Sequence, residues 1–183
     1  MNDAPRVEIL PLSPETLHAL ADGDLAGANR TAPVPLPEVF VAADWIGTWR
    51  YRSDQVRADP SVAGWVTGAV WDPEAGLVVG KAGFHAPPDA DGRVEVGYAT
   101  LPELRRRGYA RAALEELLDR AAREPAVRVV RASVSPGNVA SLGLVQQYGF
   151  VRVGEQWDEE DGLEVVYERP AERGPDEGLG RSR

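Results

Sequence analysis

Short apolar runs separated by turn residues predict seven strands along the chain. They cover residues 7–12, 64–71, 77–84, 93–100, 127–134, 150–157 and 163–168. The second and third runs flank Asp72-Pro73-Glu74-Ala75-Gly76, whose residues favour a turn, so they predict a hairpin. The last two runs flank an acidic segment that ends in Gly162, and they predict a second hairpin.

Four other segments have the signatures of helices. Ser13 followed by Pro14 marks the start of the first helix, because serine is a preferred N-cap and proline a preferred first helical residue. The other three are predicted at residues 39–57, 108–123 and 138–148. Gly23 and Gly27 interrupt the pattern after the first helix, and three prolines between residues 33 and 37 exclude regular structure there.

The order of these elements indicates the fold class. An antiparallel meander comes first, a strand-helix-strand crossover follows, and a helix and a final hairpin end the pattern. This order predicts an α+β domain with a mixed sheet over residues 1–169. Residues 170–183 have few apolar side chains, so we expect a disordered C-terminal tail.

Composition narrows the classes of function. The 183 residues include no cysteine and two histidines, which excludes disulfides and a thiol nucleophile and disfavours a metal site. The net charge of −9 disfavours nucleic-acid binding, since such proteins must neutralise phosphates. It fits a cationic acceptor or simply a soluble surface. With no membrane-spanning run and no secretion signal, we expect a cytoplasmic protein.

One turn carries residues suited to an anion. It precedes the helix at 108–123 and reads Arg105, Arg106, Arg107, Gly108, Tyr109, Ala110. The first turn of a helix presents unpaired N–H groups and a partial positive charge, glycine lets the backbone approach a ligand, and arginines bind phosphate oxygens. Neither a nucleotide P-loop nor a dinucleotide motif is present. The pattern therefore predicts a diphosphate site, with a solvated helix start as the alternative.

This turn resembles the acetyl-CoA-binding signature of the GNAT superfamily of N-acetyltransferases, in which Arg or Gln is followed three residues later by Gly and then by x-Gly or x-Ala. A second segment, from Asn138 through Ser141 and Leu144 to Gly149-Phe150, is similar to the corresponding helix of the RimJ/RimL branch. The resemblance covers about residues 64–169. It implies a central sheet of about seven strands with a splayed parallel pair that binds coenzyme A, flanked by about four helices.

The resemblance also implies which residues hold the acetyl-CoA co-substrate. Backbone groups of one splayed strand would bind the pantetheine arm, the turn would bind the diphosphate, and the later helix would complete the site. Asn138 has a second interpretation as a plain N-cap, and Ser141 as a helix-surface hydroxyl. The implied residues are Ala99, Thr100, Leu101, Arg105, Arg106, Arg107, Gly108, Tyr109, Ala110, Arg111, Asn138 and Ser141.

For catalysis, the resemblance points to Glu95 as the base, two residues before Gly97-Tyr98. Alternation along the strand places Glu95, Gly97 and Ala99 on one face, so small neighbours would leave the carboxylate facing open space. Its alternative is an edge or solvent-facing acid. Val145 stands where many members have a tyrosine as general acid, so Ser141 or water would serve, or the thiolate would leave as the anion.

The acceptor is predicted to be a primary amine of a small molecule or peptide. Trp45, Trp49 and Trp157, with the acids at 158–161, are candidate lining for a cation, although the two earlier tryptophans also fit a core stripe. His85 alone supports no assignment. Another acyl-CoA donor such as succinyl-CoA, or a non-catalytic acyl-CoA-binding regulatory module, are the alternatives. No nucleic acid or membrane partner is expected, and a homodimer is left open.

Overall fold

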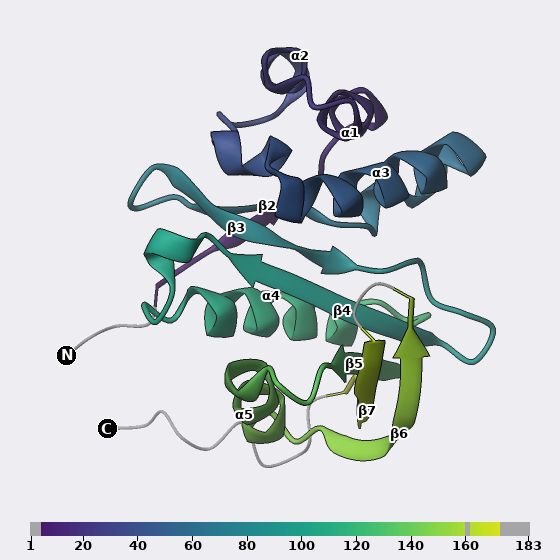
Figure 1. The fold of residues 1–183 in the computed structure, drawn as a ribbon. Coiled ribbons are helices and arrows are strands. Elements are labelled where there is room, and N and C mark those ends of the chain that lie inside the picture. The colour runs from purple at the N-terminus through teal and green to yellow at the C-terminus, as the bar shows by residue number, and fades with distance from the viewer. Residues whose placement is uncertain (1–4, 160–161, 173–183) are drawn as a thin grey trace. The chain divides into compact units, whose positions relative to one another are not determined.

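The computed structural model describes residues 5–159 and 162–172 (Figure 1). Within these residues the chain forms seven strands, five α-helices and three 3-10 helices. They are β1 (Glu8–Leu10), α1 (Pro14–Ala21), α2 (Leu25–Thr31), η1 (Glu38–Val41), α3 (Ala43–Ala58), η2 (Pro60–Gly64), β2 (Gly68–Asp72), β3 (Leu77–Phe84), β4 (Arg93–Thr100), η3 (Pro102–Leu104), α4 (Tyr109–Arg123), β5 (Val129–Val134), α5 (Val139–Gln147), β6 (Val151–Asp158) and β7 (Gly162–Pro170).

The seven strands form one mixed sheet in the order β1-β2-β3-β4-β5-β7-β6. Strands β4 and β5 are parallel, with Arg93, Val94 and Glu95 opposite Val129, Val130 and Arg131. The β1-β2, β2-β3, β5-β7 and β6-β7 pairs are antiparallel. The predicted α+β class, the seven strands and the parallel pair are therefore confirmed.

The chain forms two compact units. The first contains Met1–Pro87 and Gly97–Leu117, and the second contains Pro88–Val96 and Leu118–Arg183. Strand β4 and helix α4 each contribute residues to both. Among the described residues, no helix has the length and apolar character that crossing a membrane requires.

The core of the first unit lies between the N-terminal helices and the sheet. Figure 1 shows α1, α2 and α3 on one side of β2 and β3, with α4 on the other. Leu17, Phe40 and Trp49 are completely buried there. Each such side chain contributes about 1.5–3 kcal/mol when it leaves water, so the helices are held to the sheet by this cluster.

Helix α2 is an element that the glycine pattern did not predict. Asp24 is its N-cap, and the Asp24 carboxylate accepts the N–H of Gly27 at 2.8 Å. Gly27 therefore lies in the first turn of α2 and uses its N–H in the cap instead of breaking the helix. The start of α1 is as predicted, with Ser13 as N-cap and Pro14 as the first residue.

Side chains along β5 in the second unit alternate between buried and half-buried. Val130, Ala132 and Val134 are buried, whereas the intervening Arg131 and Ser133 are only half-buried. One face of β5 therefore belongs to the core and the other presents polar groups.

The end of the described chain extends beyond the expected domain boundary. Pro170 is the last residue of β7, and Ala171 is buried and donates its N–H to the Arg128 carbonyl at 2.9 Å. Residues 173–183 lie outside the described residues, so the disordered tail stays a prediction.

Candidate functional site

The turn before α4 combines positive charge with unusual backbone conformation. Arg105, Arg106 and Arg107 are exposed, and Arg106 has a φ of 59°, which is rare for a residue with a Cβ. Gly108 has a φ of 88°, and a Cβ there would lie 3.0 Å from Pro5 Cδ. The Ala112 N–H donates to the Gly108 carbonyl, so the helical hydrogen bonds of α4 begin there and the residues before Ala112 form its first turn.

Tyr109 anchors the start of α4 to the β2-β3 turn. Its hydroxyl donates to Asp72 Oδ2 at 2.8 Å, while Asp72 Oδ1 accepts the N–H groups of Glu74 and Ala75. Burial alone would raise the pKa of Asp72, but the Ala75 N–H, the Tyr109 hydroxyl and the Glu74 N–H together lower it. Burial and the bond to Asp72 raise the pKa of Tyr109. Asp72 was predicted only as a turn residue, and no local signal linked it to Tyr109.

The end of β4 lies next to this anchor. Ala99, Thr100 and Tyr109 belong to the lining of a small pocket, which is completed by Val70, Val79, Gly80, Tyr98 and Ala113. The Leu101 N–H donates to the Val79 carbonyl at 2.9 Å, and Leu101 is buried. Leu101 thus uses its N–H within the sheet, whereas Ala99 and Thr100 are half-buried beside the pocket.

Glu95 lies in the second unit, half-buried on β4, with its Cα opposite that of Arg131. Arg131 Nη2 lies 2.7 Å from Glu168 Oε1, and Arg93 Nε lies 3.0 Å from the same oxygen. Side chains of paired residues share a face of the sheet, so Glu95, Arg131 and Glu168 lie on one face. This polar face was not predicted, because the register between β4, β5 and β7 is not readable from the sequence.

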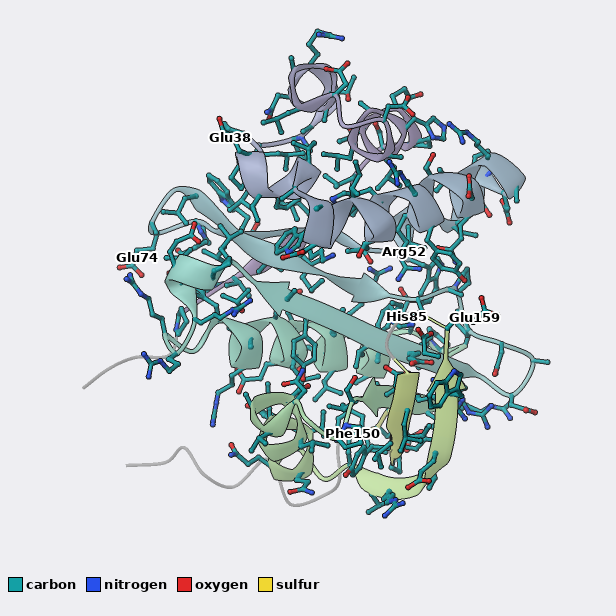
Figure 2. All side chains as sticks on the ribbon, in the orientation of Figure 1. Glu38, Arg52, Glu74, His85, Phe150 and Glu159 are labelled. Carbon is teal, nitrogen blue, oxygen red and sulfur yellow. The ribbon has the colours of Figure 1, made fainter. Side chains whose placement is uncertain are left out.

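The space beside Gly97 is occupied. A Cβ at position 97 would lie 2.8 Å from His85 Nε2, so an imidazole covers this part of the strand. Gly97, as a small residue, was expected to leave open space on this face of β4. The His85 ring limits that space. Figure 2 labels His85 and Arg52, which are linked, since Arg52 Nη1 donates to the His85 carbonyl at 3.0 Å.

Helix α5 carries the second predicted motif. Asn138 is its N-cap, and its Oδ1 accepts the Ser141 N–H at 3.1 Å, so the capping interpretation is confirmed. Asn138 is exposed and Ser141 half-buried. Val145, which the resemblance places where many members have a tyrosine, is fully buried, and its side chain therefore belongs to the core.

The tryptophans proposed for the acceptor occupy different environments. Trp49 is fully buried with its Nε1 donating to the Phe40 carbonyl at 2.6 Å, and Trp45 is 7% exposed, so their burial favours the core interpretation. Trp157 is 77% exposed. It pairs with Leu163, one residue along from the Gln156–Glu164 pair, and so projects from the opposite face to Gln156. Glu159 is exposed, and Glu160 and Asp161 lie outside the described residues.

The Trp45 and Trp49 rings already contact a cation, which is a side chain of the protein itself. Lys81, the only lysine of the chain, places Nζ 4.7 Å from the Trp45 ring and 5.5 Å from the Trp49 ring and donates to Thr48 Oγ1 at 2.5 Å. Burial and the nearby charge of Arg52 lower the pKa of Lys81 to about 8. Sequence analysis missed this lysine, because only the fold brings β3 against α3.

Within the part of the chain that the structure describes, no group of three or more His, Asp or Glu side chains could hold a metal ion. The residues that could hold a phosphorylated ligand are those of the turn before α4. Its arginines, its positive-φ backbone and the helix start provide charge and N–H donors in one stretch of chain.

Comparisons with known proteins find relatives in sequence and in structure. A curated relative, the uncharacterized N-acetyltransferase YjdG of Bacillus subtilis (strain 168), is 32% identical over 74 residues. The match covers 40% of this chain and 44% of that protein, so it spans less than half of the relative's length.

Solved structures share the fold at low identity. A chimera of the spermidine N-acetyltransferase SpeG of Vibrio cholerae with hSSAT has a TM-score of 0.64 at 13% identity, covering 91% of this chain and 96% of that one. RimJ of Mycobacterium smegmatis, in complex with CoA-disulfide, has a TM-score of 0.62 at 19% identity, covering 90% and 82%. The model of the acetyltransferase (GNAT) domain family matches residues 6–151, most of the chain. The chain therefore belongs to the GNAT acetyltransferase family.

Proposed function

We propose that this protein transfers an acetyl group from acetyl-CoA to a primary amine of a small molecule or peptide. The turn before α4 carries the proposal. Three exposed arginines surround a backbone with positive φ at Arg106 and Gly108, directly before the helix start. A turn in which positive charge and N–H donors coincide suits an anion such as a diphosphate.

The donor contacts follow from the family resemblance and the observed exposure. The turn residues Arg105 to Arg111 would hold the diphosphate, and Ala99 and Thr100 would offer backbone groups to the pantetheine arm. RimJ of M. smegmatis and a RimL structure were solved with coenzyme A, which supports the same donor here. Asn138 and Ser141 are proposed as further donor contacts on the motif match alone.

The reaction is direct attack of a neutral amine on the thioester carbonyl. An α-amino group has a pKa of about 8 and a lysine side chain about 10.4, so most acceptor molecules must lose a proton first. Glu95 is our candidate for the base that accepts this proton, directly or through water. The C–N bond forms, the C–S bond breaks, and coenzyme A leaves as the thiolate or, after protonation by Ser141 or water, as the thiol.

A second candidate function rests on Val145. Valine has no hydroxyl, and it stands, fully buried, at the position where many family members carry a general acid. A non-catalytic acyl-CoA-binding module would fit that substitution. The RimJ/RimL-like motif on α5 favours an enzyme over a binding module. It also favours a peptide amine as the acceptor.

Calorimetric titration with coenzyme A tests donor binding. Arg107→Ala should weaken this binding about three- to thirtyfold. Charge-assisted hydrogen bonds are worth about 1.5–3 kcal/mol at full strength and less where they are exposed. Arg57→Ala, at an exposed arginine of α3, is the matched control and should leave affinity unchanged. Thiol release from acetyl-CoA with a panel of amines tests transfer. Binding without release for any amine would support the non-catalytic module, and faster release from succinyl-CoA would change the donor.

A further inference from the structure

The polar face of β5, β7 and β6 in the second unit contains a hydrogen-bonded trio that the proposed mechanism does not use. Gln156 Nε2 donates to Ser133 Oγ at 3.1 Å and to Glu164 Oε2 at 2.9 Å. All three side chains are half-buried, so they are ordered by packing and still reach the surface. They come from three different strands, which fixes their relative positions.

Chemistry dictates the orientation of the Gln156 amide. A carboxylate can only accept hydrogen bonds, so the group that faces Glu164 must be the NH2 of Gln156. Its two hydrogens are then used by Glu164 and Ser133. Glu164 is therefore a positioning residue that sets which end of the amide is presented.

Two complementary groups remain on this trio. Gln156 Oε1 has no hydrogen-bond partner among the described residues, and Ser133 accepts from Gln156 but has no acceptor for its own hydroxyl hydrogen there. One acceptor and one donor, held side by side by a single hydrogen bond, match a primary carboxamide, which presents its C=O and one N–H on the same side. A trans peptide group points its N–H and C=O to opposite sides and could use only one of them here. We propose that Ser133 and Gln156 recognise a primary carboxamide of the acceptor, such as that of an α-amino amide.

The position of the trio relative to Glu95 fits such an acceptor. The Glu95 Cα pairs with that of Arg131, and Ser133 lies two residues further along β5 on the same face. A rise of about 3.3 Å per residue and a strand spacing of about 4.8 Å place the two Cα atoms about 8 Å apart. One or two peptide residues span about that distance, so an amine near Glu95 would bring its neighbouring amide to Ser133 and Gln156.

This inference rests on the proposed acetyl transfer, and three acceptors separate the two. Alaninamide offers both the C=O and the N–H of an amide. Alanine methyl ester keeps the C=O but lacks the N–H, and isopropylamine lacks both. Each acceptor is compared only between variant and wild type, so differences in amine pKa cancel.

Gln156→Leu should lower kcat/KM for alaninamide about three- to tenfold, the value of one neutral hydrogen bond, and leave the methyl ester unchanged. Ser133→Ala should lower both by a similar factor and leave isopropylamine unchanged. Glu164→Gln permits the amide to reverse, so it should reduce the preference for alaninamide over the ester. Gln146→Leu, at an exposed glutamine of α5, is the matched control and should change nothing. Coenzyme A affinity should be unaltered in every variant.

The results separate cleanly. If the wild type acetylates all three acceptors and both substitutions change them equally, amide recognition is refuted while acetyl transfer stands. The same conclusion follows if Gln156→Leu affects the ester as much as the amide. If the wild type acetylates no amine although coenzyme A binds, acetyl transfer fails and amide recognition fails with it.

Discussion

Lys81 should titrate far below an ordinary lysine, and this gives a sharp test of the packing between α3 and β3. Burial, together with the charge of Arg52, lowers its pKa from 10.5 to about 8. A tenfold change in proton affinity corresponds to about 1.4 kcal/mol, so the difference between these values is worth about 3 kcal/mol of stability. Since Lys81 is the only lysine, ¹³C-lysine labelling should give one Cε resonance that reports its pKa directly.

The sign of the linked stability follows from proton binding. Between pH 8 and pH 10.5 the unfolded chain keeps the Lys81 proton and the folded chain has lost it. The free energy of unfolding should therefore rise through this window, because stability rises with pH wherever the unfolded state binds more protons. Below pH 8 the full cost of burying the charge is present.

Urea unfolding followed by tryptophan fluorescence measures this, with Lys81→Met as the perturbation. The difference in unfolding free energy, wild type minus variant, should increase by about 3 kcal/mol from pH 7 to pH 10.5. At pH 7 the variant should be the more stable by about 1 kcal/mol, after the loss of the Thr48 hydrogen bond and the indole contacts, each worth about 0.5–1 kcal/mol. Lys81→Arg keeps a buried positive charge at every pH, so it should be less stable than Lys81→Met throughout this pH range.

A lysine resonance that titrates near 10.5, or a flat difference curve, would refute the reasoning. Either result would mean that the Lys81 ammonium is solvated in the folded protein. The position of Nζ over Trp45 and Trp49 would then not represent the structure in solution.

Tyr109→Phe should cost about 1.5 kcal/mol in thermal or urea unfolding, since it removes a hydrogen bond to a charged group, and should weaken coenzyme A binding in titration calorimetry. Its stability should also fall less than that of the wild type on acidification, because the lowered pKa of Asp72 contributes stability that is lost as the pH falls through that pKa. Gly108→Ala should destabilise by about 1 kcal/mol or more at a φ of 88° and impair binding of the donor in the same titration. Glu95→Gln should lower kcat about 10²- to 10⁴-fold with coenzyme A affinity unchanged, and a wild-type rate would remove Glu95 as the base.

Local signals predicted the elements well and tertiary contacts poorly. Strand β4 has the bounds that its apolar run predicted, and the capped start of α1 follows from Ser13 and Pro14 alone. Helix α2 was missed because Gly27 was taken as a breaker, whereas it lies in the first turn and donates its N–H to the Asp24 cap. Sequence patterns predicted an element correctly where the residues that determine it are close together in the chain.

The site shows the same division. The turn before α4 was predicted because charge, glycine and helix start are contiguous there. Lys81 could not be found, since its significance depends on a helix more than 30 residues away, with its bond to Thr48 spanning a separation of 33. Trp45 and Trp49 were equally compatible with a core stripe and a ligand wall, and only burial separated these roles.

The position of Gln156 shows why a functional face cannot be read from alternation alone. The Cα of Val151 pairs with that of Glu168, and the Cα of Gln156 pairs with that of Glu164, so both pairs lie on one face although they are an odd number of residues apart on β6. The irregularity between Arg152 and Gly154 inserts the extra residue and changes the phase of the strand. Strict alternation from Val151 would place Trp157 on the face of Glu168 and Gln156 on the opposite face. The bulge therefore decides that the amide, and not the indole, shares a face with Ser133 and Glu95, which makes the polar trio the stronger candidate for acceptor recognition.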